Sequence, residues 1–209
     1  MWVVKLGGSL GCDPLLPQWL DLLAQLGGGR VTVVGGGGAF AEEARHLQGC
    51  WQFDDLAAHN MAVLAMAQTA YQFNAMNPGL RLAASLPEIR RVLDRGQTAV
   101  WQPFELQSQQ THKATTWGHT SDSIALELAC RLNAERLVVV KSCAIDPGLS
   151  LAQLGTAGVL DSGFGALSAE AAFPIDLLHK SDLHRMRALL LDGARSSAVH
   201  GCSVPLHGR

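Results

Sequence analysis

Two short apolar runs of this chain end in glycine turns, and the first of them carries a lysine. Val3-Val4-Lys5-Leu6 leads directly into Gly7-Gly8-Ser9, and Val31-Thr32-Val33-Val34 leads into Gly35-Gly36-Gly37-Gly38. Both runs are typical of β-strands, and neighbouring parallel strands would bring the two turns to one edge of a sheet. Glycine lets backbone N–H groups approach an anion closely, and a following helix adds its positive end. The paired turns therefore predict a phosphate-binding edge.

The rest of the chain alternates β-rich runs with longer helical stretches, which predicts an α/β fold with parallel strands. Strands are expected at Trp2–Leu6, Val31–Val34, Thr98–Gln102, Arg136–Lys141 and Pro174–Leu178, with a last short run near Ser197–His200. Helices are expected at Leu15–Leu26, Ala39–Leu47, Asp54–Phe73, Ser121–Leu132 and Asp182–Leu191. The run Leu137–Val140 lacks polar alternation, as a strand buried on both faces does, so helices must cover both sides of the sheet.

The size and charge of the chain limit its partners. Its 209 residues suit one domain, and only 16% of them are charged. So little charge predicts that part of the surface is covered in a homo-oligomer. The net charge is -2 and no basic run occurs, so neither nucleic acid nor a membrane is an expected partner. No signal-like start and no apolar stretch of membrane length is found, and we expect a cytoplasmic protein.

The cysteines and histidines give no sign of a metal centre. The five cysteines form no Cys-x-x-Cys pair, so neither a disulfide framework nor a thiolate zinc site is indicated. The histidines show no metal-ligand spacing either. We therefore expect no metal site built from protein ligands.

The glycine turns also fit two alternative roles. Gly36, Gly38 and Ala41 satisfy the Gly-x-Gly-x-x-Ala spacing of dinucleotide-binding folds. A Rossmann unit, however, needs a second strand with an acidic end about 20 residues later, and residues 54–62 are helical in pattern. The glycines could instead form tight turns only, which accounts less easily for four consecutive glycines and a lysine at a strand end. A P-loop is excluded, because Gly-x-x-x-x-Gly-Lys-Ser/Thr is absent.

Four motifs, in order along the chain, resemble the signatures of the amino acid kinase superfamily. They are Val4-Lys5-Leu6-Gly7-Gly8-Ser9, Val34-Gly35-Gly36-Gly37-Gly38-Ala39-Phe40, Thr120-Ser121-Asp122-Ser123-Ile124-Ala125 and Val139-Val140-Lys141-Ser142. The resemblance spans nearly the whole chain. Its short length, its Ala58-His59-Asn60-Met61-Ala62 helix and the Lys141-Ser142 pair after the central strand are most similar to a compact branch, the aminomethylfuran phosphate kinases of methanofuran biosynthesis.

The resemblance implies an open, mainly parallel three-layer αβα sandwich in a single domain, 1–209. Residues 1–118 would form an acceptor-binding lobe and residues 119–209 a nucleotide-binding lobe. The implied reaction moves the γ-phosphoryl group of ATP, which brings Mg²⁺ with it, to a small acceptor. In the compact branch that acceptor would be a phosphomonoester such as aminomethylfuran phosphate. A carboxylate that becomes an acyl phosphate is the next choice.

The resemblance also implies which residues carry the reaction. Lys5 would neutralise the transferred group, Asp122 would orient the catalytic lysines, and Lys141 would be the second cation. Phosphate contacts are expected from Gly7, Gly8, Ser9, Gly36, Gly37 and Gly38. An alternative gives Asp122 only the role of a helix N-cap. The chain has four lysines, so finding one at the end of each of two buried strands favours the catalytic role.

One motif departs from the larger family. Many members supply a second catalytic lysine from a late Gly-Gly-Met-x-x-Lys segment, whereas this chain has Val159-Leu160-Asp161-Ser162-Gly163-Phe164-Gly165-Ala166. Either Lys141 takes over that role, or catalysis is weak or lost and the protein binds nucleotide without turnover. We favour Lys141, because its strand end should lie on the ATP side of the sheet.

The acceptor site is the least defined part of the prediction. Candidate substrate-binding residues are Asp55, His59, Asn60, Thr120 and Ser121. Asp55 and His59 are four residues apart and share a helix face, although an ordinary surface pair has the same spacing. The polar stretch between Gln102 and Thr120, which holds His112, Trp117 and His119, is too long for an ordinary connection and is expected to carry function or to move.

Overall fold

The computed structural model describes residues 1–105 and 117–199, and within this part six strands form one sheet. The strands are β1 (Trp2–Leu6), β2 (Val31–Gly35), β3 (Leu80–Ala83), β4 (Thr98–Trp101), β5 (Arg136–Lys141) and β6 (Ile175–His179). They lie in the order β3-β4-β2-β1-β5-β6, and every pairing is parallel. The predicted fold class, an open parallel sheet between helical layers, is confirmed.

The central strand, β1, brings the predicted turns together. Leu6 is level with Gly35 of β2 on one side and with Val140 of β5 on the other. The backbone of Gly7 then donates to Val140, and that of Gly36 donates to Leu6. The chain winds outward from β1 in both directions, which makes the carboxyl edge of β1 a topological switch point, where open α/β sheets bind their ligands.

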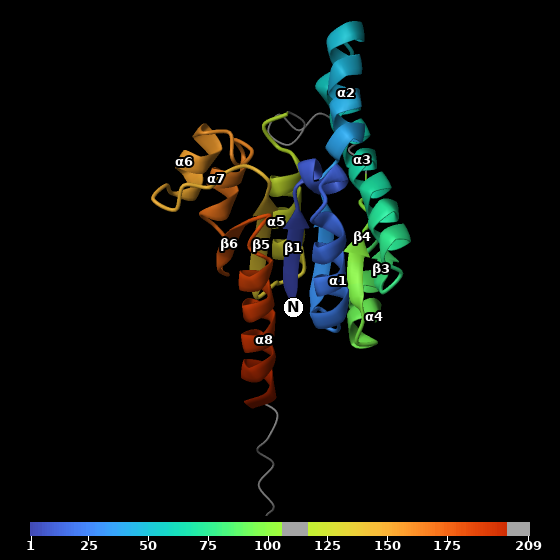
Figure 1. Cartoon of the computed structure of the whole chain (residues 1–209). Coiled ribbons are helices and arrows are strands. Elements are labelled where there is room, and N and C mark those ends of the chain that lie inside the picture. Colours follow the sequence, from blue (N-terminus) through green and yellow to red (C-terminus); the bar gives the residue numbers. More distant parts are fainter. Residues whose placement is uncertain (106–116, 200–209) are drawn as a thin grey trace, which may run out of the picture.

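Alternate side chains of β1 enter two separate cores. Trp2, Val4 and Leu6 pack on the face covered by α1 (Leu16–Leu26) and α8 (Leu183–Val199). Val3 packs on the opposite face. That face is covered by α4 (Leu86–Asp94) and α5 (Ser121–Arg131). Figure 1 shows α1 and α8 in front of the sheet, with α5 behind it. Lys5, next in the alternation, therefore points toward α5.

Several helices gather at the carboxyl edge of the sheet. The 3₁₀ helix η1 (Gly8–Cys12) follows β1, and α2 (Gly38–Trp51) and α3 (Asp55–Met76) follow β2. In Figure 1, α2 rises beyond the sheet above α3, whereas α6 (Leu151–Thr156) and α7 (Phe164–Ser168) lie on the other side of the same edge. No helix in the described ranges combines the length and apolarity of a bilayer span.

The sequence prediction located the inner elements and missed outer ones. The predicted strands correspond to β1, β2, β4, β5 and β6 within one residue at either end. We did not predict β3, a four-residue strand selected by its pairing with β4, nor α4, although Ser85 and Pro87 mark its start. The final short run was wrong, because residues 197–199 continue α8 as helix. His200 and His112 lie outside the described residues.

Candidate active site

Three charged side chains meet where β1, β5 and α5 come together. The Nζ atom of Lys5 lies 2.5 Å from one carboxylate oxygen of Asp122, and the Nζ atom of Lys141 lies 2.8 Å from the other. Lys5 and Asp122 are each only 2% exposed, whereas Lys141 is partly open. Because both lysines occupy the same face of neighbouring strands and Asp122 begins the helix above them, one carboxylate bridges two cations.

Burial and charge act on this cluster in opposite directions. Burial alone would raise the pKa of Asp122, but the charges of Lys5 and Lys141, and hydrogen bonds from both, lower that pKa below its ordinary value. Burial lowers the pKa of Lys5, against the attraction of Asp122 and with help from the nearby charge of Lys141. Both pKa values are thus lowered, because Asp122 has two cationic partners, whereas Lys5 is buried and shares its single carboxylate partner with Lys141. Lys5, Lys141 and Asp122 together carry one positive charge in excess, which suits an anionic ligand, and the Asp161 carboxylate lies near enough to act on Lys5.

The two glycine turns touch beside this cluster. A Cβ atom added to Gly8 would lie 2.4 Å from the amide nitrogen of Gly38, and one added to Gly36 would lie 2.4 Å from that of Gly8. Real side chains do not tolerate such distances, so the contact requires glycine on both turns. Gly38 also has a φ of 54°, in the left-handed region that glycine adopts readily. The turns are thus packed backbone to backbone, as the phosphate-binding prediction requires.

The turn after β1 also meets the turn after β5. The hydroxyl groups of Ser9 and Ser142 lie 2.6 Å apart. This contact joins the segment after Lys5 to the segment after Lys141. The three loops at the carboxyl ends of β1, β2 and β5 therefore form one continuous rim.

Asp161 holds the beginning of α5 from outside the helix. Its carboxylate accepts hydrogen bonds from the backbone N–H groups of Thr120 and Ser123, at 3.0 and 2.9 Å, and from both of their hydroxyls. Thr120, at the N-cap position, makes no side-chain cap bond of its own. The alternative that Asp122 merely caps this helix is therefore wrong, because Asp161 does so and the Asp122 carboxylate faces the lysines.

Asp161 belongs to the late segment in which many family members are expected to carry lysine. The sequence analysis noted the missing lysine but assigned no role to the Asp161 carboxylate in the same segment. The backbone N–H of Asp161 lies 3.3 Å from the Asp122 carboxylate, so this segment borders the charged cluster. In the part of the chain that the structure describes, Lys141 alone occupies the second cationic position on Asp122.

A cavity of about 390 Å³ opens from the charged cluster between α2, α3 and α5. Predicted residues that line it are Lys5, Gly7, Gly8, Ser9, Gly37, Gly38, Asp55, His59, Thr120, Ser121, Asp122 and Lys141. Two predicted residues, Gly36 and Asn60, are not among those that line it. Gly36 instead supports Gly8 from behind, and Asn60 lies half-buried on α3.

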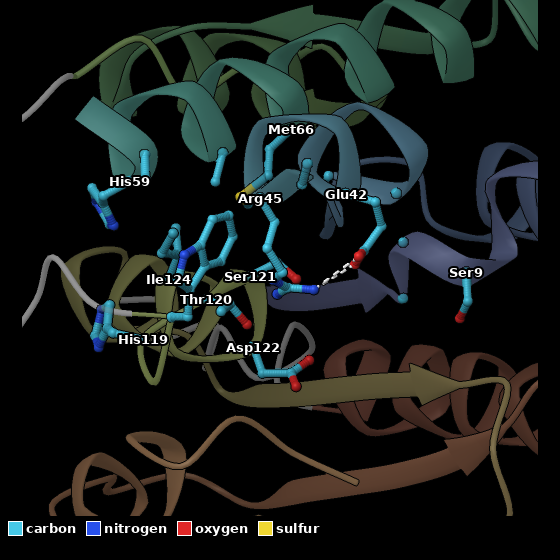
Figure 2. A pocket seen from close by; sticks show the side chains of 18 of the residues that line it. Ser9, Glu42, Arg45, His59, Met66, His119, Thr120, Ser121, Asp122 and Ile124 are labelled. Carbon is cyan, nitrogen blue, oxygen red and sulfur yellow. Dashed lines mark hydrogen bonds and ion pairs between the residues drawn. The ribbon is translucent and has the colours of Figure 1, made fainter. Parts of the chain in front are cut away.

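Side chains that the sequence analysis did not single out form the wall on α2. Arg45 makes two hydrogen bonds with the Glu42 carboxylate, at 2.8 and 2.9 Å, and its guanidinium lies 4.3 Å from the ring centroid of Trp117. Figure 2 shows Arg45 pointing into the cavity beside Glu42. A helical-spacing argument would have found both, since Glu42 and Arg45 follow Gly38 by four and seven residues and share its face.

Two histidines lie at the far end of the cavity from Ser9 (Figure 2). Burial lowers the pKa of His59, and the nearby His119 lowers it further. His119 is buried, and its Nε2 atom lies 3.1 Å from the Glu127 carboxylate. The prediction gave Trp117 and His119 to a long loop, and both turn out to line the cavity.

The described residues include no group of three or more His, Cys, Asp or Glu side chains that could hold a metal ion. Asp122 has both oxygens engaged by lysines.

Comparison with known proteins fits this geometry. The family model described as the amino acid kinase family matches residues 1–144. The chain belongs to the amino acid kinase family. The predicted family and the predicted phosphotransferase class are thereby confirmed.

The individual relatives share low sequence identity with this chain. A [5-(aminomethyl)furan-3-yl]methyl phosphate kinase of Methanocaldococcus jannaschii is 23% identical over 207 residues, which cover 95% of this chain and 91% of the relative. The crystal structure of uridylate kinase from Archaeoglobus fulgidus has a TM-score of 0.67 at 15% identity, covering 90% of this chain and 95% of that one. An isopentenyl phosphate kinase in a substrate complex has a TM-score of 0.61 at 15% identity, with the same coverage. The structural neighbours establish the fold.

Proposed function

We propose that this member of the amino acid kinase family transfers the γ-phosphoryl group of ATP to a small phosphomonoester. One observation carries the proposal: two lysines share one buried carboxylate beside two glycine turns that touch. Phosphoryl transfer asks the protein for positioning and for positive charge rather than for covalent chemistry. The cluster offers one excess positive charge at a fixed point, and the turns offer backbone N–H groups.

Each residue of the cluster has a separate task in this proposal. Lys5, buried at the end of β1, balances charge on the equatorial oxygens of the transferred group. Lys141 takes the role that a late lysine has in many family members, which is supported by its 2.8 Å contact with Asp122. Asp122 keeps both ammonium groups aligned and protonated. The turn residues Gly8 and Gly38 approach the anion with backbone only.

The cavity has room for a small acceptor. It extends from the glycine turns past the paired Glu42 and Arg45 to His59, next to the position proposed for the transferred group. The relative from M. jannaschii is named for a phosphate-bearing acceptor, [5-(aminomethyl)furan-3-yl]methyl phosphate. That compound is our first candidate, and the product would be a diphosphate. A carboxylate acceptor predicts an acyl phosphate instead.

ATP supplies the phosphoryl group, and we propose that Mg²⁺ enters with it. Residues 119–209 would hold the nucleotide and residues 1–118 the acceptor. The fit of a phosphoryl group is supported by the place of Gly8 and Gly38 in the cavity lining beside Lys5, where they present backbone and no side chain. Thr120 and Ser121 line the acceptor cavity although they belong to the nucleotide lobe, so the two proposed lobes share the site.

The experiment is to mix the protein with MgATP and an acceptor panel and to follow ADP. We expect turnover with [5-(aminomethyl)furan-3-yl]methyl phosphate, loss of turnover in Lys5→Ala and Lys141→Ala, and unchanged turnover in Arg91→Ala, which removes an exposed cation on α4. ATP binding by calorimetry with no product from any acceptor would overturn the kinase proposal. Turnover with carboxylates alone would contradict only the proposed acceptor and leave the kinase proposal standing.

We also propose a cytoplasmic homo-oligomer. The four described cysteines are free thiols, as in reducing compartments. Among its 22 residues α3 has one charged side chain, Asp55, and it exposes Leu64 and Tyr71, which lie seven residues apart as in a helix–helix seam. We expect light scattering to report more than one chain, and Leu64→Glu to shift the mass to that of a monomer. A monomeric wild-type protein would contradict this.

A further inference from the structure

The charges along the cavity are unevenly distributed. At the inner end Lys5 and Lys141 share one carboxylate, Asp122, so these three side chains carry one positive charge in excess, and Asp161 lies nearby. In the middle, Glu42 and Arg45 neutralise each other. At the outer end the cavity is lined by one further carboxylate, Asp55. A ligand that matches this pattern is negative at one end and positive at the other.

Asp55 is held in place but not neutralised. Its Oδ1 atom accepts a hydrogen bond from the Gln48 side chain at 2.8 Å, and Gln48 in turn accepts one from the Trp117 indole at 2.6 Å. Among the side chains described, those of residues 1–105 and 117–192, no Lys, Arg or His lies within ion-pair distance of Asp55. Nearby His59 has a lowered pKa because of burial, so it is neutral near pH 7 and adds no positive charge.

The two ends of the cavity lie well apart along α2. Gly38 begins α2 and Gln48 lies ten residues further along it, about 15 Å at the rise of an α-helix. The cavity between them is bordered by Trp117, Met66 and Ile124. These side chains suit a flat apolar ring placed between a phosphate and a cation.

We propose that Asp55 binds a primary ammonium group on the acceptor. This inference rests on the proposed function. Asp55 is then the residue that selects the amine, while Lys5, Lys141 and the glycine turns act on the phosphoryl group. An acceptor with a neutral hydroxyl in place of the amine would lose the charge interaction with Asp55 and keep the contacts of its phosphate and ring.

The experiment compares two acceptors, [5-(aminomethyl)furan-3-yl]methyl phosphate and its hydroxymethyl counterpart. For wild-type protein we expect kcat/KM to be roughly tenfold higher with the amine, which is the effect of one charged hydrogen bond. The difference between the two acceptors should lie mainly in KM. In Asp55→Asn the preference should disappear, because kcat/KM with the amine falls to the value measured with the hydroxymethyl compound in the same variant. Asp55→Glu should keep part of the preference.

Glu43→Gln is the matched control, because it removes one negative charge from an exposed position on α2 that does not line the cavity. Its preference for the amine should equal that of the wild type. Equal kcat/KM for both acceptors in the wild type would overturn the role of Asp55 and leave the kinase proposal standing. No turnover of either acceptor would overturn this inference together with the proposed acceptor.

Discussion

The inner and outer parts of the cavity are built in different ways. The inner end consists of Lys5, Asp122, Lys141 and the two glycine turns, all fixed by strand ends or by the start of α5. The outer part consists of Glu42, Arg45, Asp55 and other side chains on the surfaces of α2 and α3. Lys5 and Asp122 are 2% exposed, whereas the side chains of Glu42 and Arg45 are 68% and 48% exposed.

This difference separates the residues that act on the transferred group from those that select the acceptor. Charges act strongly where water is excluded, so a fixed buried cluster can stabilise the transferred group. Charges on an open wall are screened, and each contributes little to folding. The outer part can therefore change with the acceptor at small cost to stability, while the inner end cannot.

The largest effect is expected for Asp122→Asn. The substitution leaves two lysine cations near one another, one of them fully buried, without their carboxylate. Removing one partner of a buried ion pair costs about 3–5 kcal/mol of unfolding free energy. Turnover should also be lost, because the lysines lose their alignment. Urea unfolding and ADP release measure both, and a variant as stable as the wild type would refute the claim that the inner end is tightly coupled.

The same cluster predicts how stability depends on pH. The pKa of Asp122 is lower in the folded protein than its ordinary value of 3.8, so its contribution to stability is complete above that value and is lost as the pH falls through the lower folded pKa. The pKa of Lys5 is also lowered, from 10.5, so turnover should fall on the alkaline side before an ordinary lysine titrates. Unfolding curves and kcat recorded against pH would show both arms. Asp122→Asn should lack the acid arm.

A smaller loss is expected for Gly8→Ala. The new Cβ atom would lie 2.4 Å from the amide nitrogen and 2.8 Å from the Cα atom of Gly38, and backbone cannot rotate away as a side chain does. We expect a stability loss of about 1–3 kcal/mol and a marked loss of turnover, since the turns must separate. Gly49→Ala, in α2 with nothing within 4 Å of the added atom, is the control. Equal effects of the two variants would remove the special role of the paired turns.

Asp161→Asn tests a residue that acts through α5. Asparagine keeps one oxygen for the Thr120 and Ser123 groups but loses the charge near the helix N-terminus, a change of about 1–2 kcal/mol. We expect lower kcat with little change in KM, because the start of α5 also positions Asp122. Asp161→Ala should lower kcat further. A change confined to stability would show that Asp161 has only a structural role.

The same contrast explains what the sequence could predict. Lys5 and the glycine turns follow apolar strand runs, so both their position and their proximity are consequences of parallel pairing. Arg45 lies on α2, and its place in the cavity wall depends on how α2 packs above the sheet. A local sequence pattern does not predict that packing. Trp117 follows a polar stretch without periodicity. Asp161 caps a helix that begins far earlier in the chain, a contact that only tertiary structure creates.

The smallest effect is expected for Arg45→Gln, which also removes one cation from the cavity. Arg45 is half-exposed, and its partners are Glu42 and the Trp117 ring, so solvent screens much of its charge. We expect less than about 1 kcal/mol of lost stability, and a rise in KM for the acceptor of up to about fivefold with kcat nearly unchanged. Lys5→Ala provides the comparison, since it removes one cation from the inner end. If Arg45→Gln abolished turnover as Lys5→Ala should, the outer wall would belong to the catalytic centre, and the division between reaction and selection would be wrong.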